Sequence, residues 1–307
     1  MHIEGISSTP PNGPLVSVIV PCYNSERTIR QCLSSILNQR TSITFEVTAV
    51  DSSSDRTPEI IREEFPSVRL IHLEDQTSSS AARNIGFRAA RAPYCWMIDS
   101  DCVAAPNAIE LLVARLQGGR YAAVAGSLRN GTPRSLSGWV SYMIEFKEFL
   151  PTTPMRLDWK VATANIAYRR DILEHHGGFD EEMQMSEDML FNWRISSAGE
   201  QILFDPAIEA THLNRTGWKT VLNYQVDLGR FSAAARKRGG LPGQILLRHP
   251  SLILLMPFVR TLNAAKWFAV HDRRALGVFL FLLPMYALAA AFWTVGFFQQ
   301  AIKDKRS

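Results

Sequence analysis

The chain has 307 residues, of which 46% are hydrophobic and 20% charged, enough for one large domain or two smaller ones with a buried core. Its four cysteines include no Cys-x-x-Cys pair, which argues against a zinc ribbon or a redox-active dithiol. The formal net charge is +4, but eight Lys or Arg and two Asp follow residue 240, so residues 1–240 carry a net charge of −2. The basic surplus therefore belongs to the C-terminal segment, and no nucleic-acid-binding face is expected.

The first 14 residues contain Pro and Gly without an apolar core, which predicts a mobile tail and not a secretory signal. After this tail, short apolar runs alternate with segments of helical periodicity. The apolar runs predict strands at residues 15–21, 45–50, 68–73, 94–98 and 121–125. The segments between them predict helices that begin near Ser25, Asp55, Ser79 or Ser80, and Pro106. This alternation predicts an α/β fold with an open, mostly parallel sheet flanked by helices.

Polar residues follow three of these strands at the point where each strand ends. They are Tyr23 and Asn24 after the first strand, Asp51 after the second, and Asp99 with Asp101 after the fourth. Ligands of open α/β sheets bind outside the carboxyl ends of the strands. Two carboxylates at i and i+2 suit a divalent cation that bridges nucleotide phosphates, although an acidic turn is the alternative for this triplet alone. The sequence lacks a Gly-x-Gly-x-x-Gly or Walker-type loop, which disfavours a dinucleotide site or a phosphate-loop ATPase.

The second half of the chain is less regular. Its predicted elements are an aromatic helix at 139–149, strands at 162–168 and 201–204, and a basic, solvated helix at 219–238. Ser186 is placed to cap a helix whose first turn contains Glu187 and Asp188, where the helix dipole favours carboxylates. These two acids are therefore either good helix starters or functional groups, and the local pattern does not decide between the two.

The C-terminal segment, residues 241–307, is expected to associate with a membrane. Residues 276–298 contain no charge, and as a helix they would span about 35 Å, enough for a hydrocarbon core of roughly 30 Å. They predict a transmembrane helix, with a buried core helix as the alternative. Residues 245–270 are apolar but interrupted by charges and prolines, which predicts either interfacial amphipathic helices or the first span of a hairpin.

Taken together, six segments resemble inverting family 2 glycosyltransferases of the GT-A fold, a fold of nucleotide-diphospho-sugar transferases. They are residues 16–24, 50–55, 82–86, 99–101 and 177–180, and Glu187-Asp188 with Arg194 six positions on. Their order and spacing agree with the family over roughly residues 15–212. The resemblance implies that residues 15–240 form a catalytic domain that binds a nucleotide-sugar donor.

The resemblance also implies roles for single residues. It places the donor against Pro21, Tyr23, Asn24, Asp51, Ser52, Arg83 and Asp99. It implies Mg²⁺ or Mn²⁺ at Asp101, with Asp99 beside it. It makes Asp188 the general base, with Glu187 and Arg194 in support. Ser52 stands where many relatives have a second acid.

Other residues are weaker candidates. His212 is a candidate metal or phosphate contact, with a structural histidine as the alternative. Trp159 and Asn165 are candidate acceptor contacts, as is Arg194, and a packing role is an alternative for the first two.

These residue types fit the displacement of a sugar from a nucleoside diphosphate by an acceptor hydroxyl. A positioned carboxylate takes the proton of the acceptor, and a cation neutralises the leaving diphosphate. We therefore expect a membrane-anchored glycosyltransferase, in the inner or plasma membrane, with a cytoplasmic catalytic domain. Its expected acceptor is a lipid-linked saccharide or a surface polysaccharide, and its basic C-terminal residues are expected to contact membrane lipids. The alternatives are a nucleotide-sugar-binding subunit or sensor without activity, and a nucleotidyltransferase.

Overall fold

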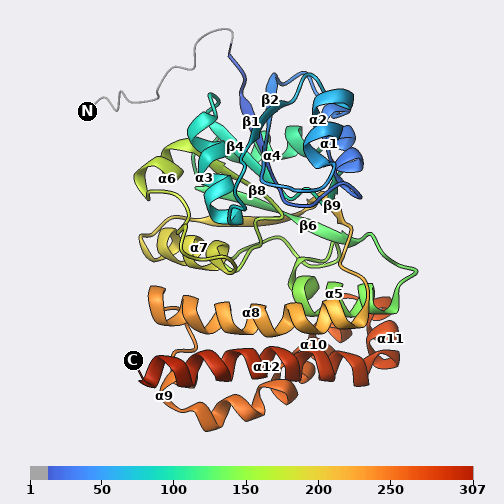
Figure 1. Ribbon diagram of the computed structural model, residues 1–307, viewed down its shortest axis with the longest axis vertical. Coiled ribbons are helices and arrows are strands. Elements are labelled where there is room, and N and C mark those ends of the chain that lie inside the picture. Colours follow the sequence, from blue (N-terminus) through green and yellow to red (C-terminus); the bar gives the residue numbers. More distant parts are fainter. Residues whose placement is uncertain (1–12, 307) are drawn as a thin grey trace.

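The computed structural model describes residues 13–306, so nearly all of the predicted N-terminal tail lies outside the described residues. A nine-stranded sheet forms the centre of the molecule, with strand order β3-β2-β1-β4-β8-β6-β9-β5 and with β7 paired to β9 (Figure 1). The strands are β1 (Val16–Cys22), β2 (Phe45–Asp51), β3 (Arg69–His72), β4 (Tyr94–Ile98), β5 (Cys102–Ala104), β6 (Ala123–Asn130), β7 (Arg156–Leu157), β8 (Asn165–Arg169) and β9 (Ile202–His212).

Helices cover the sheet and continue below it. The helices of the first half are α1 (Ile29–Leu37), α2 (Thr57–Glu64), α3 (Ser79–Ala89), α4 (Ala108–Leu116), α5 (Leu136–Phe146) and the 3₁₀ turn η1 (Lys147–Phe149). Those of the second half are α6 (Arg170–His175), α7 (Glu187–Ser197), α8 (Trp218–Gly239), α9 (Ile245–Arg248), the 3₁₀ segment η2 (Pro250–Leu255), α10 (Met256–His271), α11 (Arg273–Phe281) and α12 (Leu283–Arg306).

The first half of the sheet follows the predicted pattern. β1 pairs in parallel with β2 on one side and β4 on the other, and β2 pairs in parallel with β3. Val18, Ile19 and Val20 of β1 are fully buried, because helices cover both faces of these central strands. Parallel pairing brings the carboxyl ends of β1, β2 and β4 to one edge, where the predicted polar residues follow them.

The second half of the sheet is mixed. β8 lies between β4 and β6 and runs antiparallel to both, while β9 pairs in parallel with β6. β5 and β7 add two further antiparallel pairings along β9. The predicted open α/β sheet with flanking helices is confirmed, but its second half is not mostly parallel. The sequence could not predict this difference, because the apolar run that forms β8 carries no signal of strand direction.

Two predicted helix caps are shifted. α1 begins only at Ile29, because the Ser25 hydroxyl lies 2.7 Å from the Ser100 hydroxyl and does not cap a helix. The cap of α3 is Ser78, whose hydroxyl accepts a hydrogen bond from the Ala81 amide. Both shifts move the helix start by a few residues and leave the predicted helices in place.

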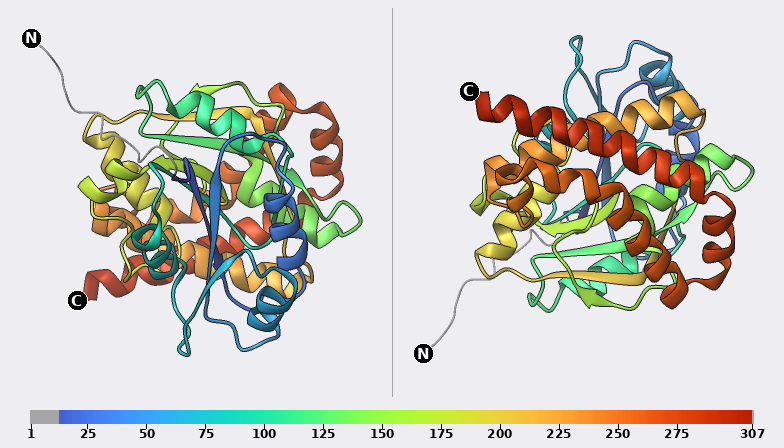
Figure 2. Two further views of the ribbon diagram at one scale, coloured as in Figure 1. Left: turned by 90° about the horizontal axis from the view of Figure 1, so that it is seen from above. Right: turned by 90° about the horizontal axis from the view of Figure 1, so that it is seen from below.

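The helix α8 runs between the sheet and a layer of C-terminal helices, as the side view and the view from below show (Figures 1 and 2). It packs lengthwise against α12, with a glycine on each helix at the contact. A Cβ atom on Gly229 would lie 2.0 Å from the Trp293 carbonyl oxygen, and one on Gly296 would lie 1.8 Å from that of Val226. The prediction of a solvated helix at 219–238 is therefore wrong, because the two backbones approach too closely to admit water or side chains between them.

The predicted single helix at 276–298 is also wrong. The chain bends by 81° between α11 and α12, immediately before Pro284. The ring of a proline prevents the helix from continuing straight through its position. α12 then buries Tyr286, Trp293 and Phe297 inside the protein. By length and composition, one other helix of the described residues, Pro250–His271, could cross a membrane, and the bent pair would be a second.

Candidate active site

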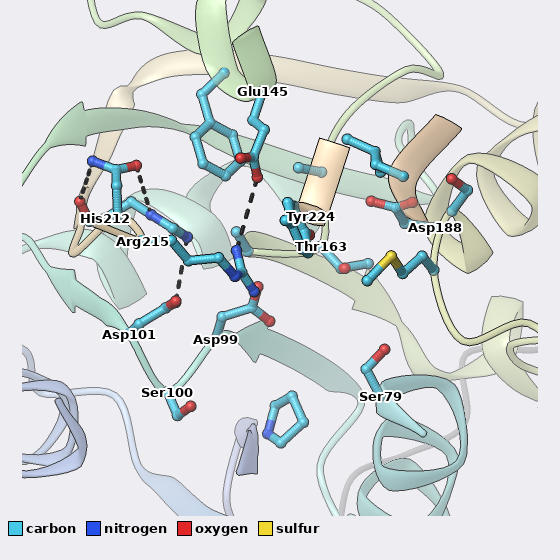
Figure 3. Close-up of a pocket in the computed structure, with 18 of the residues that line it drawn as sticks. Ser79, Asp99, Ser100, Asp101, Glu145, Thr163, Asp188, His212, Arg215 and Tyr224 are labelled. Atoms are coloured by element: carbon cyan, nitrogen blue, oxygen red, sulfur yellow. Dashed lines mark hydrogen bonds and ion pairs between the residues drawn. The ribbon is translucent and has the colours of Figure 1, made fainter. Parts of the chain in front are cut away.

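A cavity of about 1010 Å³ opens between the carboxyl ends of the sheet strands, α7 and α8 (Figure 3). Most of the predicted site residues line it, although they come from distant parts of the chain. The predicted residues that line it are Pro21, Tyr23, Asn24, Arg83, Asp99, Asp101, Glu187, Asp188 and His212. The fold therefore brings the predicted donor, metal and base residues to one place.

The acidic triplet is held where β4 and β5 meet. β5 pairs with the end of β9 so that Cys102 lies opposite His212. This register brings Nε2 of His212 to 3.4 Å from Oδ1 of Asp101. Oδ1 of Asp101 is shielded from solvent, and it has no hydrogen-bond partner among residues 13–306. The structure therefore places a carboxylate oxygen beside an imidazole nitrogen without a hydrogen bond that satisfies either.

The hydrogen bonds of His212 show which of its nitrogens is free. The amide nitrogen of Asn214 donates to Asn130 Oδ1 at 2.8 Å, so its oxygen is the acceptor for His212 Nδ1 at 2.9 Å. Nδ1 therefore carries the proton, and Nε2 presents a lone pair toward Asp101. Two facing electron-pair donors fit a divalent cation between them, and such an oriented histidine is typical of metal ligands.

Cys102 completes the group of nearby ligand atoms, all of which lie within 4.8 Å of one another. Burial raises the pKa of the Cys102 thiol well above its usual value, so the sulfur stays protonated. A neutral thiol is a poor ligand for a hard cation. Asp101 and His212, with Asp99 next to them, therefore fit Mg²⁺ or Mn²⁺ better than a thiolate-binding metal.

Arg83 connects the two acidic parts of the site. Its guanidinium donates to Asp99 at 2.7 Å and also pairs with Glu187. The Ser79 hydroxyl donates to the same Glu187 carboxylate at 2.9 Å. The Glu187 carboxylate thus already has protein partners, which suits the predicted role of Glu187 as a support for Asp188.

Asp188 lies in the first turn of α7, as the sequence predicts, and its carboxylate accepts a hydrogen bond from the Met189 amide at 2.7 Å. Burial, together with the charge of Glu187, raises the pKa of Asp188 to about 7, against the opposing effect of Arg83. A carboxylate with such a pKa can accept a proton near neutral pH more readily than an ordinary aspartate. Asp188 therefore has the properties of a general base.

Tyr23 and Asn24 follow β1 at the mouth of the cavity. The Tyr23 side chain is 47% exposed, which leaves an aromatic face free for a planar ligand. Asn24 adopts a left-handed backbone conformation with φ of 50°, and its side-chain oxygen accepts from the Ser54 amide at 3.1 Å. This turn directs the chain along the cavity edge.

Two predicted donor residues lie elsewhere. Asp51 is fully buried, where it accepts hydrogen bonds from Ser53 and lies 2.7 Å from His72 Nδ1. Ser52 accepts from the Thr77 amide at 3.1 Å. Among the described residues that line the cavity, Thr77 is present but Asp51 and Ser52 are not. Their place is behind the lining, where they hold the segment that carries Thr77.

The three predicted acceptor contacts do not line the cavity, because each side chain has packing or hydrogen-bond partners elsewhere. Asn165 accepts from the Trp96 indole at 3.1 Å and donates to the Ile208 carbonyl at 3.1 Å. Trp159 packs against the Trp193 ring, with 5.0 Å between ring centres. Arg194 donates to the Gly178 carbonyl, so it holds the loop that precedes α7.

Several cavity residues are missing from the sequence prediction, among them Glu145, Arg215 and Tyr224. Glu145 accepts from the Ser141 hydroxyl at 2.8 Å and lies 3.9 Å from Arg215, and burial raises its pKa. The Arg215 guanidinium lies 3.9 Å from the centre of the Tyr224 ring (Figure 3). Glu145 follows an uncharged run at residues 139–144, and this contrast is a signal that the sequence offers. Arg215 and Tyr224 lie in polar segments that show no such contrast.

Comparison with known proteins identifies the family of this chain. The family described as Glycosyl transferase family 2 matches residues 17–177. The glycosyltransferase AglE of Haloferax volcanii is 26% identical over 208 residues, covering 65% of this chain and 67% of AglE. The uncharacterized glycosyltransferase EpsJ of Bacillus subtilis is 29% identical over 202 residues, covering 62% of this chain and 58% of EpsJ. The matched parts thus span between about half and two thirds of these curated relatives.

The fold also matches solved structures. The mannosyltransferase PcManGT of Pyrobaculum calidifontis, in complex with GDP-Man and Mn²⁺, superposes with a TM-score of 0.60 at 23% identity, over 95% of this chain and 86% of PcManGT. At this identity the likeness shows a shared fold. The family match covers more than half of the chain and includes the acidic triplet and Arg83. The chain therefore belongs to glycosyl transferase family 2.

Proposed function

We propose that this protein transfers a sugar, with inversion and with the help of a divalent cation, from a nucleotide-sugar donor to an acceptor near a membrane surface. One observation carries the proposal. Asp101 with His212, and Asp188 with its raised pKa, line a single cavity. One set of residues suits the diphosphate of the donor, and the other suits the hydroxyl of the acceptor.

The donor would occupy the side of the cavity formed by β1 and β4. Tyr23 offers its exposed ring to the base, and Asn24 and Pro21 lie beside it on the lining. The solved relatives with this fold support a donor of this class, since PcManGT contains GDP-Man and the Staphylococcus aureus protein TarS contains UDP-GlcNAc.

Asp101, His212 and Asp99 would hold the cation. When bound there, it would offset the charge that gathers on the leaving diphosphate. Arg83 keeps the Asp99 carboxylate in place through its 2.7 Å hydrogen bond. Asn214 keeps the His212 ring oriented through Nδ1. These contacts fix the ligands before the donor arrives.

The transfer itself would be a single displacement at the anomeric carbon. The acceptor oxygen forms a bond to this carbon while the bond from the carbon to the diphosphate oxygen breaks, and the nucleoside diphosphate leaves. Asp188 takes the proton of the acceptor hydroxyl, a contribution of roughly 10²–10⁴-fold to the rate. Because attack and departure occur on opposite faces, the configuration inverts.

The C-terminal helices would hold the protein at a membrane, with the catalytic part on the cytoplasmic side. Large apolar side chains protrude from η2, α10 and α11: Leu254 is 71% exposed, Phe258 70% and Phe281 74%. Basic side chains of the same segment would face anionic headgroups. The acceptor would then be a membrane-proximal one, such as a lipid-linked saccharide or a surface polysaccharide.

A nucleotide-sugar panel tests this function. The full chain is incubated with each donor, with Mg²⁺ or Mn²⁺, and release of nucleoside diphosphate is measured for the wild type, Asp188→Asn and the exposed control Glu182→Gln. We expect release to fall at least 10²-fold in Asp188→Asn, with donor affinity retained, and to be unchanged in Glu182→Gln. Donor binding without turnover in the wild type would indicate a sensor, and pyrophosphate as product would indicate a nucleotidyltransferase.

A further inference from the structure

The same cavity is also lined by residues that the proposed sugar-transfer chemistry does not use. They include four basic side chains from four separate segments, and we call the part of the cavity that they line the basic lobe. They are Lys147 of η1, Lys160 of the segment after β7, Arg236 of α8 and Arg260 of α10. α8 forms one wall along the whole length, because Thr220, Tyr224, Leu228, Ser232 and Arg236 all line the cavity.

The positive charge of the basic lobe is only partly neutralised by the protein. Glu148 is the acid that lines the cavity beside these residues, and it pairs with Lys147 at 3.0 Å. Arg236 uses one guanidinium nitrogen to donate to the Ser232 carbonyl at 2.8 Å. Arg260 lies over the Trp293 ring, 4.2 Å from its centre. Neither contact supplies a negative charge.

The two arginines also have unused donors. Nε of Arg236 and Nε of Arg260 are both shielded from solvent and lack a hydrogen-bond partner within the described part of the chain. Burial and the neighbouring Arg260 lower the pKa of Arg236 to about 10. Buried donors without partners and uncompensated charge are each unfavourable, and an anion with several oxygens would remove both costs.

The location of the basic lobe relates it to the acceptor. Lys160 belongs to the same short segment as Thr163, which lines the cavity together with Asp188. Tyr224 and Arg236 are twelve residues apart on α8, a rise of about 18 Å, which leaves room for more than one sugar. On its outer side, α10 exposes Phe258 and Leu262. A chain attached to an anion in the lobe would therefore be close to an apolar surface.

We propose that the basic lobe binds the phosphate or diphosphate group of an anionic acceptor, whose attacking hydroxyl then lies at Asp188. This inference rests on the proposed function and adds the chemical class of the acceptor. A phosphate group has several oxygens that can accept hydrogen bonds, and planar guanidinium groups bind phosphate in a bidentate manner.

Binding of farnesyl diphosphate to the full chain in neutral detergent tests this proposal. Titration calorimetry is carried out with EDTA, so that the donor side cannot hold a diphosphate through a cation. We expect Arg236→Gln and Arg260→Gln each to raise the Kd at least tenfold. Arg230→Gln, which removes an equal charge from α8 outside this cavity, should leave the Kd unchanged. Arg260→Lys should restore part of the affinity and shows that the fold is intact.

Two further probes distinguish the source of the phosphate. Inorganic pyrophosphate that binds as tightly as farnesyl diphosphate, with the same arginine dependence, supports a soluble phosphorylated acceptor. Tighter binding of farnesyl diphosphate, with no binding of farnesol, supports a lipid-linked one. Lack of binding by the wild type, or equal affinity in all variants, overturns the proposal. Release of nucleoside diphosphate in the donor panel is measured independently, so failure of the basic lobe and failure of the transferase give different results.

Discussion

Arg83 on α3 and Asp99 at the end of β4 share a hydrogen bond of 2.7 Å, and the other side of the same guanidinium pairs with Glu187 on α7. The Arg83 side chain is only 4% exposed and that of Glu187 only 7%, so water screens these charges little. One arginine therefore ties the strand end that carries the predicted metal ligands to the helix that carries the predicted base.

Arg83→Met should lower the free energy of unfolding by about 3–5 kcal/mol, because it leaves the buried Glu187 carboxylate without its cation. Thermal or urea unfolding of the full chain measures this effect. Arg88→Met on the same helix is the matched control, since its pair with Glu181 is at 3.4 Å and its side chain is 57% exposed. It should change stability by less than about 1 kcal/mol. Equal losses in the two variants would contradict the structural role of Arg83.

The pH profile of transfer should reflect Asp188. Its pKa is raised to about 7, so the carboxylate form that accepts a proton is lost as the pH falls through that value. We expect kcat/KM to rise with pH over this range. Glu187→Gln removes a repelling charge and leaves Arg83 free to stabilise the ionised Asp188, so it should move the acidic limb to lower pH. A limb that stays in place in Glu187→Gln would argue against Asp188 as the titrating group.

The orientation of His212 should matter for metal affinity. Asn214→Ala removes the acceptor that fixes the Nδ1 proton, and changes of this kind cost about 10–100-fold in metal affinity. We expect a corresponding rise in the Mn²⁺ concentration that gives half-maximal release of nucleoside diphosphate. Asn38→Ala, at an exposed position after α1, is the control and should leave the requirement unchanged. An unaltered Mn²⁺ requirement in Asn214→Ala would remove His212 from the ligand set.

The contact between α8 and α12 should depend on its glycines. In Gly296→Ala the new methyl would meet the Val226 carbonyl oxygen at 1.8 Å, so the helices must separate and the melting temperature should fall. Gly277→Ala on α11 is the control, because nothing lies within 4 Å of its added Cβ. Alanine is the better helix former, so this control should be neutral or more stable by up to about 1 kcal/mol. A similar melting temperature for the two variants would show that the close packing of α12 is not needed.

The sequence predicts β1, β2 and β4 well, because each is a largely buried, mostly apolar run with polar residues at or just after its carboxyl end. The pattern therefore predicts β1 and β4, and it also identifies the acids that follow β4. The direction of β8 could not be predicted, since its apolar run fits either orientation. Likewise, the uncharged stretch 276–298 shows hydrophobicity but not whether lipid or protein covers it, and in the structure protein covers Tyr286 and Trp293.

The predicted acceptor contacts lie outside the cavity for a related physical reason. Trp159 and Asn165 have side chains that suit a sugar, but tertiary contacts occupy them elsewhere. Arg236 and Arg260, in contrast, look like ordinary surface charges in the sequence. They line the cavity only because of the way α8 and α10 pack, and the local sequence around them does not predict that packing.

Arg260 and Trp293 belong to the C-terminal helices, yet both line the cavity of the candidate active site. Shortening the chain at residue 240 to obtain a more soluble protein would thus remove residues that line the candidate active site, in addition to the proposed membrane contact. It would open one side of the cavity to water and expose the face of α8 that packs against α12 at Gly229. A loss of activity in such a shortened protein would then reflect the missing cavity residues. Loss of membrane binding would need to be measured separately.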